Sequence, residues 1–150
     1  MSQRIDLGQL HPQQLVELKK STEEEVTHFT SSLQALQTAQ SKLKDCISSI
    51  DNMKSQQDKQ LLVPLTSSLY LPGKVQDPEK FLVDIGTGYY VEKTSEDAKR
   101  VYTSKITKLN EDSAKLKEIL VQKNEILNQL NMALRTKVLQ MEKENAKPAA

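Results

Sequence analysis

Two long stretches without glycine or proline dominate this 150-residue sequence, residues 13–63 and residues 89–147. Because glycine and proline are the residues that most readily end a helix, each stretch can form a helix of roughly 70 Å at about 1.5 Å per residue. Three of the four glycines and three of the five prolines lie between positions 64 and 88. The sequence therefore predicts a mainly α fold, with two long helices flanking a short region of strands and turns.

The first stretch has the heptad pattern of a coiled coil. Eight of its eleven a and d positions, which run from Val26 to Leu61, are apolar. Leu15 precedes Val26 by eleven residues, a step that relaxes left-handed supercoiling, so we expect the seam to straighten near its start. Pro12 fits the first turn of the helix, where its missing N–H costs no hydrogen bond.

The second stretch repeats the pattern, since nine of its twelve a and d positions are apolar or aromatic. Thr94 can cap the start of this helix, and the acidic residues Glu96 and Asp97 suit its positive end. Two seams of similar length, joined by a turn-rich insert, are expected to pair antiparallel within one chain. A parallel dimer of extended chains is the alternative.

The central region carries the motifs LLVPLTSSLYLPGKV and FLVDIGTGYYVEK, each of which predicts two short strands around a turn. In the first motif, Pro64 cannot donate to a strand ladder and belongs at an edge or bulge. A strand at Leu69–Leu71 is expected to run into a turn at Pro72 and Gly73. In the second motif, the run from Gly86 to Gly88 is expected to reverse the chain.

Four strands of this length cannot stabilise an isolated sheet in water. Their apolar faces and open edges need cover from other subunits. The sequence therefore predicts obligate oligomerisation through strand addition.

Several classes of partner are disfavoured by composition. The formal net charge is only +1, which gives no general attraction to a phosphate backbone, so we expect no nucleic-acid partner. No apolar run approaches the roughly 20 residues that span a bilayer, so we expect no membrane partner. The first ten residues, MSQRIDLGQL, lack the apolar stretch of a secretory signal, and the single Cys46 fits a reducing compartment, so an intracellular location is expected.

Enzymatic chemistry is not expected either. One cysteine and two isolated histidines cannot build a usual structural zinc site, and His28 and Cys46 are better explained as helix-surface or seam residues. The run from Gly86 to Gly88 lacks the longer glycine pattern and the downstream Gly-Lys-Ser/Thr of a phosphate-binding loop. We therefore expect neither a cofactor nor catalytic activity.

The order long helix, LLVPLTSSLYLPGK, FLVDIGTGYYVEK, long helix resembles the α-class subunits of the prefoldin family. Two hairpins rather than one distinguish the α class from the β class. The resemblance spans nearly the whole chain and implies a single subunit, residues 1–150. Its parts would be an N-terminal coiled-coil helix (1–60), a double β-hairpin assembly region (61–93) and a C-terminal coiled-coil helix (94–147).

The resemblance also implies a function. Such a subunit joins a heterohexamer of two α-class and four β-class chains, whose hairpins form an inter-subunit β-barrel platform. The free coiled-coil tips hold non-native proteins, notably actin and tubulin, and pass them without ATP to the cytosolic group II chaperonin. The implied location is the cytoplasm, and a nuclear role is left open. The alternative is a coiled-coil scaffold without chaperone activity in another cytosolic or cytoskeletal complex, which would have no affinity for unfolded proteins.

Two sets of residues are expected to carry these roles. By position in the hairpins, the platform contacts would be Leu65, Leu69, Leu71, Phe81, Val83, Ile85, Tyr89 and Val91. Both chain termini lie at the far tip of such a hairpin, so apolar residues near them are candidates for a client-binding patch. These are Leu7, Leu10, Leu15, Leu18, Leu134, Val138, Leu139 and Met141. The simpler explanation is that Leu7 and Leu10 staple the helix end and that Leu134 completes the seam.

Overall fold

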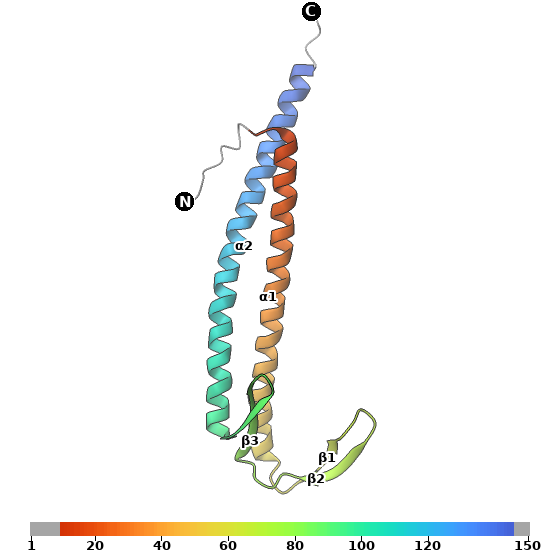
Figure 1. Cartoon of the computed structure of the whole chain (residues 1–150), viewed down its shortest axis with the longest axis vertical. Coiled ribbons are helices and arrows are strands. Elements are labelled where there is room, and N and C mark those ends of the chain that lie inside the picture. Colours follow the sequence, from red (N-terminus) through yellow and green to blue (C-terminus); the bar gives the residue numbers. More distant parts are fainter. Residues whose placement is uncertain (1–9, 146–150) are drawn as a thin grey trace, which may run out of the picture. The chain divides into compact units, whose positions relative to one another are not determined.

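The computed structural model describes residues 10–145, which form two long helices joined by two antiparallel hairpins (Figure 1). The elements in chain order are α1 (Pro12–Ser55), β1 (Gln60–Pro64), β2 (Tyr70–Lys74), β3 (Lys80–Gly86), β4 (Tyr89–Thr94) and α2 (Ser95–Asn145). The mainly α fold class predicted from the sequence is confirmed. The chain divides into two compact units: a terminal unit, residues 1–35 with 112–150, and a central unit, residues 36–111.

In the terminal unit, α1 and α2 lie side by side and run antiparallel (Figure 1). Lys137 of α2 donates a hydrogen bond to the carbonyl of Leu10, and Lys123 forms an ion pair with Glu25 of α1. As the residue number rises along one helix it falls along the other, which confirms the antiparallel arrangement over the parallel alternative. Leu15 and Leu130 are both fully buried in this seam.

The eleven-residue spacing from Leu15 to Val26 interrupts the heptad pattern of α1 between Leu18 and Val26. Thr22 occupies it and is only 6% exposed, and its hydroxyl donates to the Leu18 carbonyl at 2.8 Å. By satisfying its own polar atom, Thr22 can be buried where the heptad pattern would place an apolar residue. Thr22 therefore fills the eleven-residue step from Leu15 to Val26, which the sequence analysis did not foresee; the expected straightening of the seam stays a prediction.

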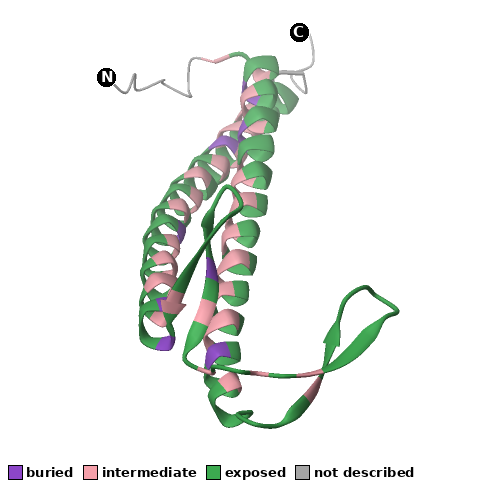
Figure 2. Cartoon of the chain, turned by 60° about the horizontal axis from the view of Figure 1, so that its bottom comes forward, coloured by how far each residue is buried: buried purple, intermediate pink, exposed green. Residues whose placement is uncertain are grey.

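The core of the central unit joins one strand to both helices. Val83 of β3 packs with Ile50 of α1 and Ala98 of α2, and all three are buried. Partly buried side chains surround this cluster: Phe81, Val101 and Tyr102. Figure 2 shows the β3–β4 hairpin lying along the helices, with almost all of β1–β2 exposed. The two hairpins thus differ in how far the chain's own helices cover them.

The hairpin turns follow the sequence in one case and depart from it in the other. Positive φ angles at Gly86, Thr87 and Gly88 reverse the chain between β3 and β4, as expected. In the first hairpin, however, the expected turn at Pro72 and Gly73 is wrong. These two residues lie inside β2, which continues to Lys74, and the chain reverses before Tyr70 instead.

The first helix is also shorter than its heptad pattern suggested. It ends at Ser55, and Asp58 then adopts a left-handed conformation with φ 61°. Leu61, expected at an a position of the seam, lies in β1 instead. The coiled coil of the first helix therefore stops one to two turns before residue 60.

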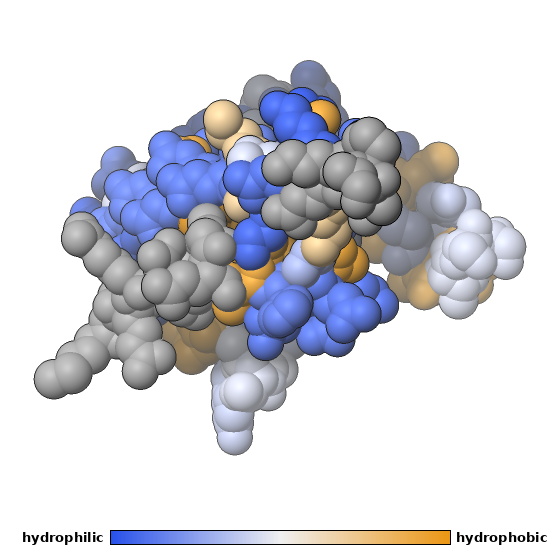
Figure 3. All heavy atoms as spheres, turned by 90° about the horizontal axis from the view of Figure 1, so that it is seen from above, coloured by the Kyte–Doolittle hydropathy of each residue, from blue (hydrophilic) through white to orange (hydrophobic). Residues whose placement is uncertain are grey.

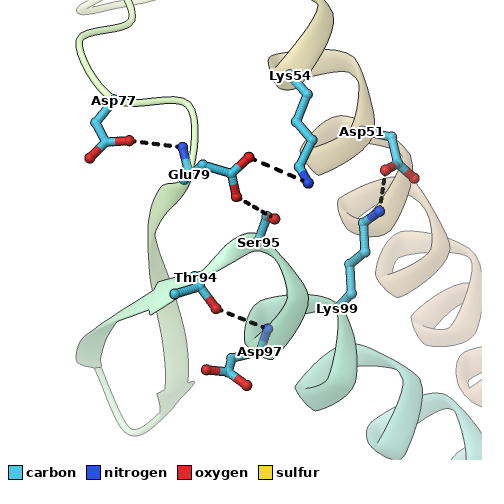
Figure 4. A network of polar contacts seen from close by, with 8 residues as sticks. All are labelled: Asp51, Lys54, Asp77, Glu79, Thr94, Ser95, Asp97 and Lys99. Carbon is cyan, nitrogen blue, oxygen red and sulfur yellow. Dashed lines mark hydrogen bonds and ion pairs between the residues drawn. The ribbon is translucent and has the colours of Figure 1, made fainter.

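A polar network fixes the insert to the helix ends (Figure 4). Glu79 accepts a hydrogen bond from the Ser95 hydroxyl at 2.9 Å and forms an ion pair with Lys54 at 3.4 Å. The Asp97 amide donates to the Thr94 hydroxyl at 3.3 Å, which confirms Thr94 as the cap of α2. These contacts tie α1, the start of β3 and the start of α2 to one another.

We predict that Leu130→Ala destabilises the coiled coil by about 2–5 kcal/mol, because it removes a fully buried side chain and leaves a cavity. Met132→Ala, two residues away on the same helix at 70% exposure, should change the free energy of unfolding by less than about 0.5 kcal/mol. Urea unfolding followed by far-UV circular dichroism measures both. Equal destabilisation by the two variants would contradict the assigned seam.

Candidate functional site

The β1–β2 hairpin presents apolar side chains on both of its faces. Side chains alternate between faces along a strand, so Leu62 and Tyr70 lie on one face and Leu61 and Leu71 on the other. Neither strand has a buried residue, and Leu62 is 67% exposed. Leu65 and Leu69, in the connecting loop, are exposed as well. This hairpin is thus an apolar surface that the described part of the chain leaves uncovered.

The β3–β4 hairpin is covered on one face only. Its inner face includes Val83, which is 1% exposed. Its outer face includes Leu82, at 72% exposure, and Tyr90. Val83 was expected to contact other subunits, but its side chain packs inside its own subunit, against Ile50 and Ala98. Phe81 is partly buried against the same cluster, and its contact with other subunits stays a prediction.

The remaining expected platform residues are accessible. Exposed side chains are found at Leu65, Leu69, Leu71, Ile85, Tyr89 and Val91. Sequence reasoning missed Leu62, Leu82 and Tyr90, which are also exposed. Their alternation with the residues that were chosen is visible in the sequence, but the sequence does not show which face the helices cover. Whether these side chains contact partner chains remains a prediction.

The two prolines of the first hairpin point their nitrogens outward. The Leu65 amide donates to the Leu69 carbonyl at 2.9 Å, which fixes the direction of that amide toward β2. Amide directions alternate along a strand. The Leu62 amide and the ring nitrogens of Pro64 and Pro72 therefore point to the outer edges of the hairpin, so neither proline costs it a hydrogen bond.

This placement makes the two edges unequal. Pro72 interrupts the edge of β2 at its middle residue, whereas Pro64 interrupts the edge of β1 only at its last residue. The edge of β1 therefore offers the longer run of outward amides, which a strand of another chain can use.

A small hollow of about 200 Å³ lies where β3 meets the helices, lined by Cys46, Ser49, Ile50, Phe81, Leu82, Val83 and Tyr102. Burial raises the pKa of Tyr102 above its ordinary value of 10.0, and the neighbouring Cys46 and Asp84 raise it further. The phenol is therefore protonated throughout the physiological range. Among the described residues, no group of three His, Cys, Asp or Glu side chains could hold a metal ion.

The second candidate surface lies at the free end of the coiled coil. Beyond the contact between Lys137 and Leu10, α2 continues past the start of α1 at Pro12 (Figure 1). Val138 and Leu139, in this part of α2, are 50% and 56% exposed. Figure 3, which looks down onto this end, shows apolar side chains gathered between mainly hydrophilic ones.

A hollow of about 590 Å³ marks this tip. It is lined by Lys19, Asn131, Leu134, Arg135, Val138, Leu139 and Glu142. All but Lys19 lie on α2 at spacings of three, four and seven residues, the spacings that share one helix face. We call these seven residues the tip hollow. Its polar members were missed in the sequence, although their helical spacing from Leu134 could have revealed them.

The expected client-binding residues are distributed unevenly. The tip hollow brings together Leu134, Val138 and Leu139, and Met141 is exposed close by in sequence. Leu10 and Leu18 are half-buried. Leu15 is fully buried in the seam, so its proposed exposure at the tip is corrected. Leu7 lies outside the described residues.

Comparison with known proteins decides the family. The family model for the prefoldin subunit matches residues 22–140. The chain belongs to the prefoldin subunit family. Members of this family are chaperone subunits, so a chaperone-type function follows for this prefoldin subunit.

Individual relatives agree with this assignment. This prefoldin subunit is 40% identical over 144 residues to prefoldin subunit 5 of Homo sapiens, covering 94% of this chain and 92% of that one. It is 36% identical over 141 residues to prefoldin subunit 5 of Arabidopsis thaliana, with 93% of each chain covered. Its fold resembles a chain in the cryo-EM structure of filamentous PFD from Methanocaldococcus jannaschii, with a TM-score of 0.68 at 19% identity, over 77% of this chain and 97% of that one.

We predict that Leu62→Pro weakens association with partner subunits by about fivefold, the effect of losing one hydrogen bond of about 1 kcal/mol. The substitution removes an outward amide but no hydrogen bond within the hairpin. Leu62→Val also shortens the side chain but keeps the amide. Native mass spectrometry of co-expressed subunits compares the two, and equal assembly of both variants would exclude the edge of β1 as a pairing edge.

Proposed function

We propose that this prefoldin subunit is an ATP-independent holdase, which captures non-native proteins such as actin and tubulin at its coiled-coil tip. It would act in the cytoplasm and deliver its clients to the cytosolic group II chaperonin. The observation that carries the proposal is the exposed apolar surface on α2 at Val138, Leu139 and Met141. A coiled-coil seam alone would not require these side chains, because they lie where α1 no longer flanks α2.

The hairpins would supply the assembly that a holdase of this kind needs. Two hairpins agree with an α-class role, in a hexamer with one further α-class and four β-class subunits. The uncovered faces of β1–β2 and the outer face of β3–β4 are apolar surfaces that partner strands and side chains would bury. Partner subunits would thereby complete a core that the single chain lacks.

Binding at one tip would be weak. Burial of apolar surface contributes about 25 cal/mol per Å², and three half-exposed side chains offer little area. Several tips of one assembly closing on one client would raise the avidity without high affinity at any single tip. Weak individual contacts also allow a client to leave without ATP, because each one breaks readily.

A direct test replaces the exposed tip residues by serine. We expect the triple variant Val138→Ser, Leu139→Ser and Met141→Ser to need roughly tenfold more assembled complex for the same suppression of client aggregation, since the three half-exposed side chains together contribute about 1.4 kcal/mol to binding. Light scattering of denatured actin diluted into the complex measures suppression. Native mass spectrometry of the same sample verifies that the complex is intact.

The matched control changes exposed apolar residues of α2 away from the tip hollow. The triple variant Ile119→Ser, Val121→Ser and Ile126→Ser removes three exposed apolar side chains of α2 outside the tip and should leave suppression unchanged. Equal loss in the control would show that the tip has no special role. A complex that never suppresses aggregation would instead support the scaffold alternative.

A further inference from the structure

The tip carries an excess of positive charge that the chain as a whole does not have. Residues 10–20 and 131–143 hold five basic side chains, Lys19, Lys20, Arg135, Lys137 and Lys143, against two acidic ones, Glu17 and Glu142. The whole chain has an excess of only one basic residue. Positive charge therefore exceeds negative charge in the segments nearest the tip, ahead of the acidic run Glu23–Glu25 of α1.

Two of these basic residues line the tip hollow itself. Lys19 of α1 and Arg135 of α2 lie around the same space as Leu134, Val138 and Leu139. The Lys19 ammonium forms an ion pair with Glu23, with 3.6 Å between Nζ and the carboxylate oxygen Oε1. Arg135 is exposed and, among the described side chains, forms no ion pair. Its guanidinium, with five fixed donors, is therefore available to a carboxylate from outside.

We infer that the tip hollow selects client segments in which a few apolar side chains are flanked by acidic ones. The inference rests on the proposed holdase function and adds a charge preference to it. Apolar side chains of the client would occupy the space over Leu134, Val138 and Leu139, while a flanking Asp or Glu would face Arg135 and Lys19. Glu142 also lines the hollow, and its carboxylate repels an acidic side chain placed near it. A client segment with one acidic flank is therefore favoured over a segment with two.

The acidic flank should strengthen binding only as much as an ion pair at the exposed rim of a site does, which is less than a buried ion pair would. Arg135 is exposed, so solvent and salt screen its interaction over about 8 Å at physiological ionic strength. A single acidic flank should therefore strengthen binding by about two- to fivefold. That factor is modest, and it belongs to one tip among the several that would engage one client.

The experiment needs a signal from this tip alone within the assembled complex. Cys46 is the only cysteine in the chain, so a Cys46→Ser background with Gln140→Cys places an environment-sensitive dye on the exposed side of α2 near the tip hollow. Three short peptides share one apolar centre and differ in a single flank, which is Asp, Ser or Lys. We expect affinity to fall in the order Asp, Ser, Lys, and the differences to shrink as salt is added.

Arg135→Glu should abolish or reverse this order without removing the binding of the Ser-flanked peptide. Lys117→Glu makes the same change in net charge on exposed α2 surface outside the tip hollow and should leave the order as it is. Equal affinity for the three peptides would overturn the charge preference and leave the holdase proposal standing. If no peptide binds, the inference fails, and the aggregation assay on the triple serine variant shows separately whether the holdase proposal fails with it.

Discussion

The packing of Val83 between Ile50 of α1 and Ala98 of α2 is the contact on which the central unit depends. It joins one strand of the insert to the ends of both helices, and it buries Val83 on the inner face of β3–β4. Lys99 with Asp51, and Glu79 with Lys54 and Ser95, hold the same junction from its polar side (Figure 4). Since α2 begins directly after β4, this junction also sets the direction in which α2 leaves the insert.

Because that core is small, much of the apolar surface has no cover within the described residues. The buried hydrophobic residues are few: Leu15, Ile50, Val83, Ala98 and Leu130. The apolar seams of the two helices pack against each other. The apolar surfaces that stay exposed are therefore the hairpin faces and the tip of α2. The hairpins combine apolar faces with open backbone edges, whereas the tip combines apolar side chains with basic ones. The first combination suits permanent strand pairing, and the second suits weak and reversible contact.

How far the sequence predicted this arrangement depends on the kind of signal involved. Helical periodicity and the absence of glycine and proline were sufficient to predict both long helices, because these patterns are local. The Gly86 turn was predicted correctly because positive φ angles at neighbouring positions favour glycine. Pro72 misled the prediction because proline also fits a strand when its nitrogen faces an unpaired edge. That condition depends on the register with β1, which is not a local property.

The site residues illustrate the same limit. Alternation in FLVDIG shows that Phe81 and Val83 share a face but not what covers it, so Val83 was assigned to a subunit interface instead of to its own core. Leu15 was assigned to the tip because it lies near the N-terminus, yet its side chain is fully buried in the seam. Val138 and Leu139 were recognised as exposed because they fall outside the heptad seam, at positions beside Leu134 and Met141.

An apolar client site at the end of a coiled coil faces a physical conflict, because exposed apolar side chains promote self-association as readily as client binding. Basic residues around the tip hollow ease this conflict. Two copies of the same tip would bring Arg135 and Lys19 of one against those of the other, and like charges in close contact oppose such pairing. A client with an acidic flank meets no such opposition. The charge that we infer to select clients would therefore also keep this tip of one assembly from binding the same tip of a second assembly.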